Sequence, residues 1–331
     1  MEHRARVSRY RDELKGLAML WIVWFHSGLM LPWHFDDARL LGYGGVDIFL
    51  FLMGMGLCYS LQKNAGLRRY LVRRLKRLLP AYLPIVIVWM AVMYPQYGYS
   101  AAQTVGGIIG NLLFVGYWLQ LDGVYNWFAN TVFTFVLLAP AVYAVLSRGK
   151  GRGLIVLLVP AFGIGTATIG MEQMMPVSRL PIFILGMAFG LWQGTAKRRA
   201  WNIGLAASFA AGLALVLFCM HRRTGLLIDY GMYWYPFVLI TPPLCMGIAF
   251  LFSKMNNIKR AFAPLRWVGK SSFEIYLINV WIYEISKQYT VSAAAWALLC
   301  VANLLLGIGY HLLVRRFSRR LLPAASAEQS R

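Results

Sequence analysis

Apolar runs of membrane-spanning length recur along the whole chain and limit its fold more than any other feature. Each run approaches the roughly 20 residues that an α-helix needs to cross a bilayer core. The runs cover residues 14–33, 42–61, 78–97, 127–147, 153–170, 179–195, 201–219, 234–253, 272–288 and 293–314. Because 59% of the 331 residues are hydrophobic, a soluble domain could not bury them all. We therefore expect an all-α polytopic membrane protein with about ten transmembrane helices.

The distribution of positive charge predicts the topology. The net charge is +21, and most of the 33 Lys and Arg residues lie in short loops between apolar runs, as the positive-inside rule predicts. Residues 104–121 are long enough to cross but rich in glycine, and a crossing there would move most later basic loops outside. We therefore expect both termini to be cytoplasmic and segment 104–121 to be re-entrant or interfacial, roofing a site. The same clustering argues against nucleic-acid binding.

The chain shows no linker, repeat or second domain. We expect a single transmembrane domain over residues 1–320, a short cytoplasmic tail over 321–331, and a multi-pass location in the plasma (inner) membrane. The first apolar run lacks a small-residue cleavage site and is not a cleaved signal peptide.

We expect no metal and no tightly bound cofactor. The four cysteines lie in apolar runs without a CxxC pair, which favours core packing over a disulfide or a metal site. An outer loop holds His34, Asp36 and Asp37, but their spacing does not suit ligands on a helix, and no further ligand is evident.

Ionisable residues at membrane depth indicate a reactive site. His26 follows Lys15 by eleven residues, so both lie on one side of the helix, roughly 16 Å apart along it. Asp47 lies near the outer end of the next run, and we expect it to meet His26. A carboxylate beside an imidazole prepares a general base. A purely structural polar pair is the alternative, but such residues usually face cavities.

A basic stretch precedes the third run. Arg73, Arg74 and Arg77 share helical spacing and can present one cationic face at the cytoplasmic surface. Ordinary contact with lipid headgroups would explain such a face. Its density beside Lys15 favours an anionic ligand such as a nucleotide-type phosphate. Arg179, at the outer end of its run, is either an interfacial anchor or a cavity residue.

Five motifs, in order along the chain, resemble those of the membrane-bound acyltransferase 3 family, the polysaccharide O-acyltransferases of bacteria. They are "DELKG" with a histidine eleven residues after its basic residue, "GGVDIFLFLMGMG", "YLVRRLKRLLPAY", "RLPIFILGMAFG" and "WVGKSSFEIYLIN". The resemblance covers about residues 11 to 315. Three positions depart from the family pattern: Asn279 replaces a histidine, Val132 replaces a glutamate, and Met53 replaces a serine.

The resemblance implies an O-acyltransferase that uses acyl-CoA, usually acetyl-CoA, as co-substrate from the cytoplasm. It implies that Lys15, Arg73, Arg74 and Arg77 hold the donor phosphates. The acceptor would be a hydroxyl of an extracytoplasmic or lipid-linked glycan, reached from outside beside membrane lipid.

His26 would act as general base, with Asp47 in support, or as a covalent acyl carrier. We expect five further residues to line the cavity: Arg179, Ser271, Tyr276, Asn279 and Trp127. The alternatives are a flippase or permease for an anionic lipid-linked sugar, with His26 and Asp47 as a proton relay, and a structural subunit of a glycan export assembly.

Overall fold

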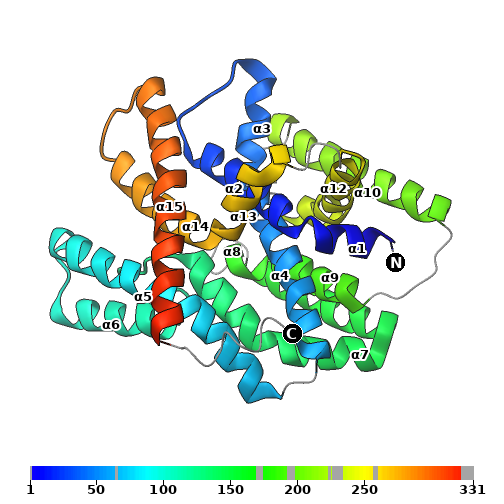
Figure 1. The fold of residues 1–331 in the computed structure, drawn as a ribbon, viewed down its shortest axis with the longest axis horizontal. Helices are drawn as coiled ribbons and strands as arrows, with labels where there is room; N and C mark the ends of the chain where they lie inside the picture. Colours follow the sequence, from blue (N-terminus) through cyan, green and yellow to red (C-terminus); the bar gives the residue numbers. More distant parts are fainter. Residues whose placement is uncertain are drawn as a thin grey trace.

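The computed structural model describes residues 2–63, 66–168, 174–191, 198–222, 225, 234–255 and 260–321. These residues form a helical bundle without strands (Figure 1). Its N-terminal half contains α1 (Glu2–Arg9), α2 (Arg11–His26), η1 (Trp33–Asp36), α3 (Asp37–Leu40), η2 (Leu41–Gly44), α4 (Gly45–Gln62), α5 (Leu67–Tyr97), α6 (Ala101–Leu113) and α7 (Trp127–Ala167). The second half contains α8 (Met174–Val177), α9 (Leu180–Leu191), α10 (Arg198–Arg222), α12 (Tyr235–Lys254), α13 (Ala263–Lys270), α14 (Ser272–Ser286) and α15 (Ala293–Leu321).

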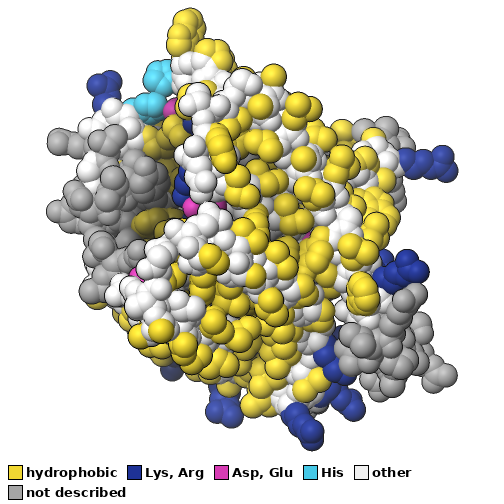
Figure 2. Space-filling view, turned by 90° about the vertical axis from the view of Figure 1, so that its left-hand side faces the viewer, with side chains coloured by type: hydrophobic (Ala, Val, Ile, Leu, Met, Phe, Trp, Pro, Cys, Tyr) yellow, Lys and Arg dark blue, Asp and Glu magenta, His cyan; other side chains and the backbone are white. Residues whose placement is uncertain are grey.

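Six helical stretches within the described residues are long and apolar enough to cross a membrane: Trp33–Gln62, Leu67–Tyr97, Trp127–Gly149, Arg199–Arg222, Tyr235–Lys254 and Ala293–Ser318. Shorter apolar helices cover Gly151–Ala167 and Met175–Leu191. The expected helical membrane protein is therefore confirmed, whereas ten crossings and cytoplasmic termini remain predictions. Hydrophobic side chains cover much of the molecular surface, and Lys and Arg gather toward its lower and right edges (Figure 2).

The first predicted span ends earlier than its apolar run. The run continues to residue 33, but α2 ends at His26, and Ser27 already has extended backbone with ψ of 158°. Gly28 and Pro32 follow, and neither favours helix continuation. The prediction that His26 lies inside a longer helix was therefore wrong: His26 occupies the last turn of α2, where the chain leaves the helix.

Two predicted spans lie within α7, whose two halves fold back on each other. α7 runs from Trp127 to Ala167, although we expected separate spans at 127–147 and 153–170. A Cβ added at Gly153 would lie only 2.6 Å from the carbonyl oxygen of Val145. Residues eight apart in a straight helix are about 12 Å apart, so the chain must reverse between Val145 and Gly153. The two apolar legs therefore pack as a hairpin, with glycine at their closest approach.

Glycines allow α4 and α9 to pack closely and in parallel. A Cβ at Gly54 would lie 2.4 Å from the carbonyl oxygen of Phe183, and one at Gly186 would lie 2.1 Å from that of Phe51. Small residues at such a crossing bring two backbones together. We call this contact the α4–α9 seam. Asp47 lies seven residues before Gly54, and Arg179 lies seven residues before Gly186. The close packing therefore brings these two charged residues together at the start of the seam.

Segment 104–121 is a short helix followed by turns. α6 contains 13 residues and is about 20 Å long, which is less than a bilayer core requires. Asn111 is fully buried and donates to the Tyr94 hydroxyl and to the carbonyls of Gly107 and Gly123, while its side-chain oxygen accepts from Tyr125 N–H. This one amide pins α6 to α5 and to the start of α7. A re-entrant or interfacial placement of the segment remains a prediction.

Candidate active site

A cluster of positive charges lies at the first turns of α2. Lys15 Nζ pairs with Asp12 Oδ1 at 2.8 Å, and Arg11 and Arg77 lie close enough to repel its charge. Arg74 is repelled by the same two arginines and by Arg73, and its guanidinium lies 5.7 Å from the Tyr70 ring centre. Arg11, Lys15, Arg73, Arg74 and Arg77 are called the cationic cluster below. Its residues come from two segments, α2 and the first half of α5.

The cationic cluster contains the four donor-binding residues expected from the sequence, of which Arg73 and Arg77 are exposed. Arg11 was not expected, although its place one residue before the "DELKG" motif puts it on the same first turns of α2. Five cations with one carboxylate partner among the described residues, Asp12, form a site that suits an anionic ligand.

A cleft of about 350 Å³ opens beside the same end of α2. Its lining comprises Arg9, Tyr10, Asp12, Glu13, Phe262, Arg266 and Lys270. Glu13 is buried and pairs with Arg266 at 2.8 Å, and Asp12 contributes to both the cleft and the cationic cluster. The Lys15 end of α2 therefore borders an open cleft that is lined by basic and hydrogen-bonding side chains.

His26 closes the other end of α2 and contacts α14. Its Nδ1 lies 2.9 Å from the carbonyl oxygen of Ile22 and 3.1 Å from the side-chain nitrogen of Asn279. The side-chain amides of Asn303 on α15 and Asn279 are hydrogen-bonded to each other at 2.8 Å. The Tyr283 ring packs edge-on at 4.9 Å between centres. His26 is half-buried, whereas both asparagines are buried, so an amide chain positions one side of the imidazole.

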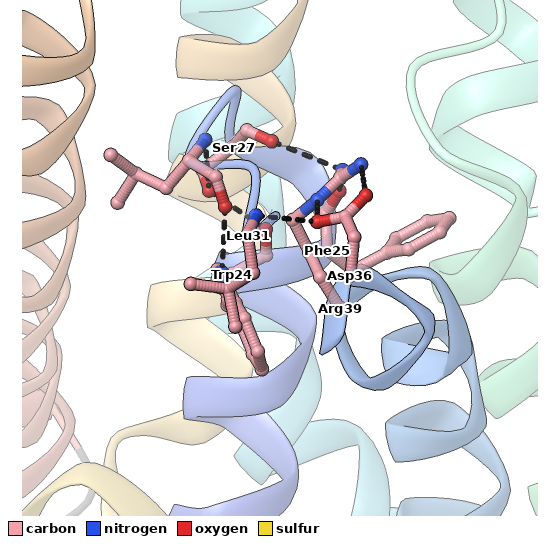
Figure 3. A network of polar contacts seen from close by, with 7 residues as sticks. Trp24, Phe25, Ser27, Leu31, Asp36 and Arg39 are labelled. Carbon is pink, nitrogen blue, oxygen red and sulfur yellow. Dashed lines mark hydrogen bonds and ion pairs between the residues drawn. The ribbon is translucent and has the colours of Figure 1, made fainter. Parts of the chain in front are cut away.

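The loop after His26 is held by a second polar network (Figure 3). Arg39 is buried and donates to both carboxylate oxygens of Asp36, at 2.8 and 2.7 Å. The same guanidinium reaches the carbonyl oxygens of Phe25 and Ser27 at 3.4 Å. The last carbonyls of a helix lack partners within the helix, and here Arg39 supplies one. The backbone on both sides of His26 is therefore anchored to the η1–α3 loop.

Asp47 and Arg179 form a buried charged pair at the start of the α4–α9 seam. Both side chains are about 1% exposed, and Arg179 Nε lies 3.9 Å from Asp47 Oδ2. The guanidinium donates to the carbonyl oxygen of Met175 at 2.8 Å and lies 5.0 Å from the Trp127 ring centre and 5.4 Å from that of Trp234. A buried ion pair this long, with aromatic faces beside it, indicates a polar site inside the bundle rather than an interfacial anchor.

The structure gives His26 and Asp47 different partners among the residues it describes. The expected contact between them is therefore replaced by two pairs: His26 with Asn279, and Asp47 with Arg179. The reason is geometric, because α2 ends at His26 while Gly54 and Gly186 hold Asp47 against α9.

One face of α14 joins the two pairs. Tyr276 and Asn279 are three residues apart on this helix, so their side chains are neighbours. Tyr276 is buried, lies within electrostatic range of Arg179 and packs its ring 4.6 Å from that of Phe128. The His26 pair and the Arg179 pair therefore flank one short stretch of α14.

The remaining expected residue, Ser271, lies at the other end of this helix. Ser271 precedes α14 directly and is fully buried, and its hydroxyl has no hydrogen-bond partner in the described part of the chain.

Sequence reasoning missed Asn303 and Tyr283. Asn303 is the only asparagine in the apolar stretch 293–314, and a buried amide in such a stretch usually has a polar partner. That signal could have identified it. Tyr283 is one of many aromatic residues, and no spacing separates it from ordinary packing residues.

These features define a helical membrane protein with a basic site at one end of α2 and an imidazole at the other. The family model described as "acyltransferase domain" of the acyltransferase 3 type matches residues 10–312, nearly the whole chain, and the chain belongs to this family. Neither the curated proteins nor the solved structures that were compared gave a match. The family membership establishes a membrane acyltransferase and favours group transfer over the flippase and export-subunit alternatives.

Proposed function

We propose that this protein is an O-acyltransferase of the plasma (inner) membrane. In this proposal it transfers an acyl group, specifically acetyl, from cytoplasmic acyl-CoA to a hydroxyl of an extracytoplasmic or lipid-linked glycan. The observation that carries the proposal is the placement of the cationic cluster and His26 at opposite ends of α2. Eleven residues of helix separate Lys15 from His26 by about 16 Å.

The donor would lie along α2. A nucleotide-type phosphate group suits the cationic cluster, because arginines bind phosphate through paired N–H donors and Lys15 adds a point charge. The pantetheine arm of coenzyme A is long enough to span the distance from this end of α2 to His26. The donor is a co-substrate in this proposal, and no resident cofactor is needed for the transfer.

The tautomer of His26 supports a role as general base. The Ile22 carbonyl can only accept a hydrogen bond, so a hydrogen bond at 2.9 Å requires the proton on Nδ1. The lone pair then lies on Nε2. In this arrangement the amides of Asn279 and Asn303 both turn, since amide oxygen and nitrogen are assigned from their partners. Asn279 Oδ1 then faces the ring, and Asn279 Nδ2 donates to Asn303 Oδ1, which otherwise lacks a partner among the described residues.

The proposed transfer takes place in one displacement. Nε2 of His26 accepts the proton of the acceptor hydroxyl, and the hydroxyl oxygen attacks the thioester carbonyl carbon. The carbon–sulfur bond breaks as the oxygen–carbon bond forms, and the thiolate leaves as coenzyme A after taking the proton from the imidazolium. Holding both substrates at His26 replaces a bimolecular encounter in solution.

The acceptor would lie beside Asp47 and Arg179. Trp127 and Trp234 flank the guanidinium, and aromatic faces with buried charges suit a sugar ring with its hydroxyls. Ser271 and Tyr276 contribute polar atoms at the α14 wall. In this proposal Asp47 supports the reaction by holding Arg179 in place, not by contacting His26.

The test is acyl transfer by purified protein. Detergent-solubilised protein is incubated with radiolabelled acetyl-CoA and glycan extracted from cells that lack the gene, and label on the glycan is counted. We expect His26→Ala to lower the rate at least about a hundredfold, as loss of a general base does. His311→Gln is the matched control, because this histidine also contacts a polar partner, Glu274 at 3.0 Å, away from the site.

Two outcomes would contradict the proposal. Full activity in His26→Ala would remove His26 from the reaction, and absence of acetyl-CoA binding by the wild-type protein in calorimetry would remove the donor. Intact mass after incubation with acetyl-CoA alone separates the two mechanisms. A general base leaves the protein mass unchanged, whereas an acyl-histidine adds an acetyl group that His26→Ala lacks.

A further inference from the structure

Three potential metal ligands meet outside the site described above. Asp37 Oδ2 lies 2.7 Å from His221 Nε2 and 3.9 Å from His34 Nδ1. The two imidazole rings meet edge to face at 4.6 Å between centres, and one ligand atom from each of the three residues lies within 4.8 Å of the others. Histidine side chains gather at the upper edge of the molecule beside an acidic one (Figure 2).

The three residues come from two distant segments. His34 lies in η1 and Asp37 begins α3, both in the loop after His26. His221 lies in the last turn of α10, 184 residues from Asp37. The sequence-based expectation of no metal rested on the absence of a further ligand near His34, Asp36 and Asp37. The fold supplies that ligand from α10.

The donor set has the chemistry of a zinc site. Two imidazole nitrogens and one carboxylate oxygen bind Zn²⁺ at about 2.0–2.2 Å and leave a fourth tetrahedral position for water. Such bond lengths place ligand atoms roughly 3.3 Å apart, which lies between the two spacings seen here. His34 is 84% exposed, so its ring can move toward Asp37 without disturbing the core.

Neighbouring carboxylates do not compete for this role. Asp36 is already bound by Arg39 through both carboxylate oxygens, which leaves Asp37 as the acidic ligand of the loop. His221 is already oriented for binding, because its Nε2 contacts Asp37 Oδ2. Asp37 and His221 thus form a preorganised half-site, and His34 completes it.

We propose that His34, Asp37 and His221 bind a Zn²⁺ ion that fastens the end of α10 to the loop following His26. Metal binding between two segments stabilises the folded protein by the binding free energy. Because Arg39, bound by Asp36 of the same loop, donates to the carbonyls of Phe25 and Ser27, the ion would also stabilise the backbone beside His26. The proposal does not depend on the identity of the acyl acceptor or donor.

The test measures zinc binding and stability on the full chain in detergent. The protein is purified through a tag without histidines, stripped with chelator, and titrated with ZnCl₂ by calorimetry and thermal unfolding. We expect one ion per chain and a higher midpoint with zinc. We expect His34→Ala to lower the affinity at least about tenfold while leaving the metal-free midpoint unchanged, because this side chain is exposed.

Further variants and a spectroscopic probe make the result decisive. Asp37→Asn should weaken zinc binding as well, and Co²⁺ should give the visible absorption of a tetrahedral site in the wild type but not in His34→Ala. His311→Gln is the matched control, since its pairing with Glu274 lacks a third ligand among the described residues. No zinc binding by the wild type, or equal binding by His34→Ala, would overturn the proposal.

Discussion

The side-chain nitrogen of Asn279 lies 3.1 Å from Nδ1 of His26. The acyltransferase 3 pattern has a histidine at this position of α14, so one of the three residues that depart from the family pattern is in direct contact with the proposed base. The Asn303 amide is hydrogen-bonded to that of Asn279 at 2.8 Å and fixes the amide plane. An amide can orient the imidazole as a second imidazole would, and it carries no charge of its own.

The first prediction concerns this contact. Asn279→Leu keeps a similar volume but cannot hydrogen-bond His26, so we expect kcat to fall by about tenfold or more while KM for acetyl-CoA stays within about twofold. Steady-state transfer assays measure both constants. Asn202→Leu, at an exposed position on α10, is the control and should behave as the wild type. An unchanged kcat in Asn279→Leu would show that the amide does not position the base.

The second prediction concerns the cationic cluster. Arg74→Ala with Arg77→Ala should raise KM for acetyl-CoA at least about tenfold with little change in kcat, because two phosphate contacts are lost before the chemical step. The control is Arg68→Ala with Arg69→Ala, which removes the same charge from exposed positions earlier on α5. An equal KM for acetyl-CoA in the two double variants would show that the cluster contributes no more to donor binding than other positive charges on the cytoplasmic side.

The third prediction concerns the buried pair of Asp47 and Arg179. Asp47→Asn leaves a buried guanidinium without its counter-ion, and Arg179→Met leaves a buried carboxylate, so each should lower stability by about 3 kcal/mol. The double variant should be less destabilised than the sum of the two single variants, because neither charge remains. Thermal unfolding in detergent measures this coupling. Strict additivity would show that the 3.9 Å separation carries no interaction.

The fourth prediction concerns the glycine seam between α4 and α9. Gly186→Ala places a Cβ about 2.1 Å from the carbonyl oxygen of Phe51, so the helices must separate and the unfolding midpoint should fall by several degrees. Gly309→Ala on α15 meets nothing within 4 Å and should be neutral or slightly stabilising, since alanine is the better helix former. Similar midpoints for the two variants would contradict the close packing.

The order of apolar runs and the main polar residues were predictable from the sequence. The run lengths predicted helices throughout, and every predicted span contains helix in the described structure. Helical spacing predicted that Lys15 and His26 share one helix, which the structure confirms, while the reactive role of His26 stays a prediction. These properties follow from local periodicity and from the cost of burying ionisable groups.

Contacts between distant segments could not be predicted in the same way. Asp47 pairs with Arg179 because glycines 132 positions apart allow two backbones to touch, and His26 contacts Asn279 because α2 stops seven residues before its apolar run ends. Neither the end of α2 nor the α4–α9 crossing leaves a periodic signal in the sequence.

The sequence by itself determined that this protein is a helical membrane protein resembling an acyltransferase family, with a basic stretch and a histidine at the two ends of one helix. Only the tertiary structure decided which residue contacts that histidine, which cation neutralises Asp47, and that His221 joins His34 and Asp37. The physical reason is that periodicity and charge are properties of neighbouring residues. Pairing across the bundle depends on where each helix ends and how closely two backbones can approach.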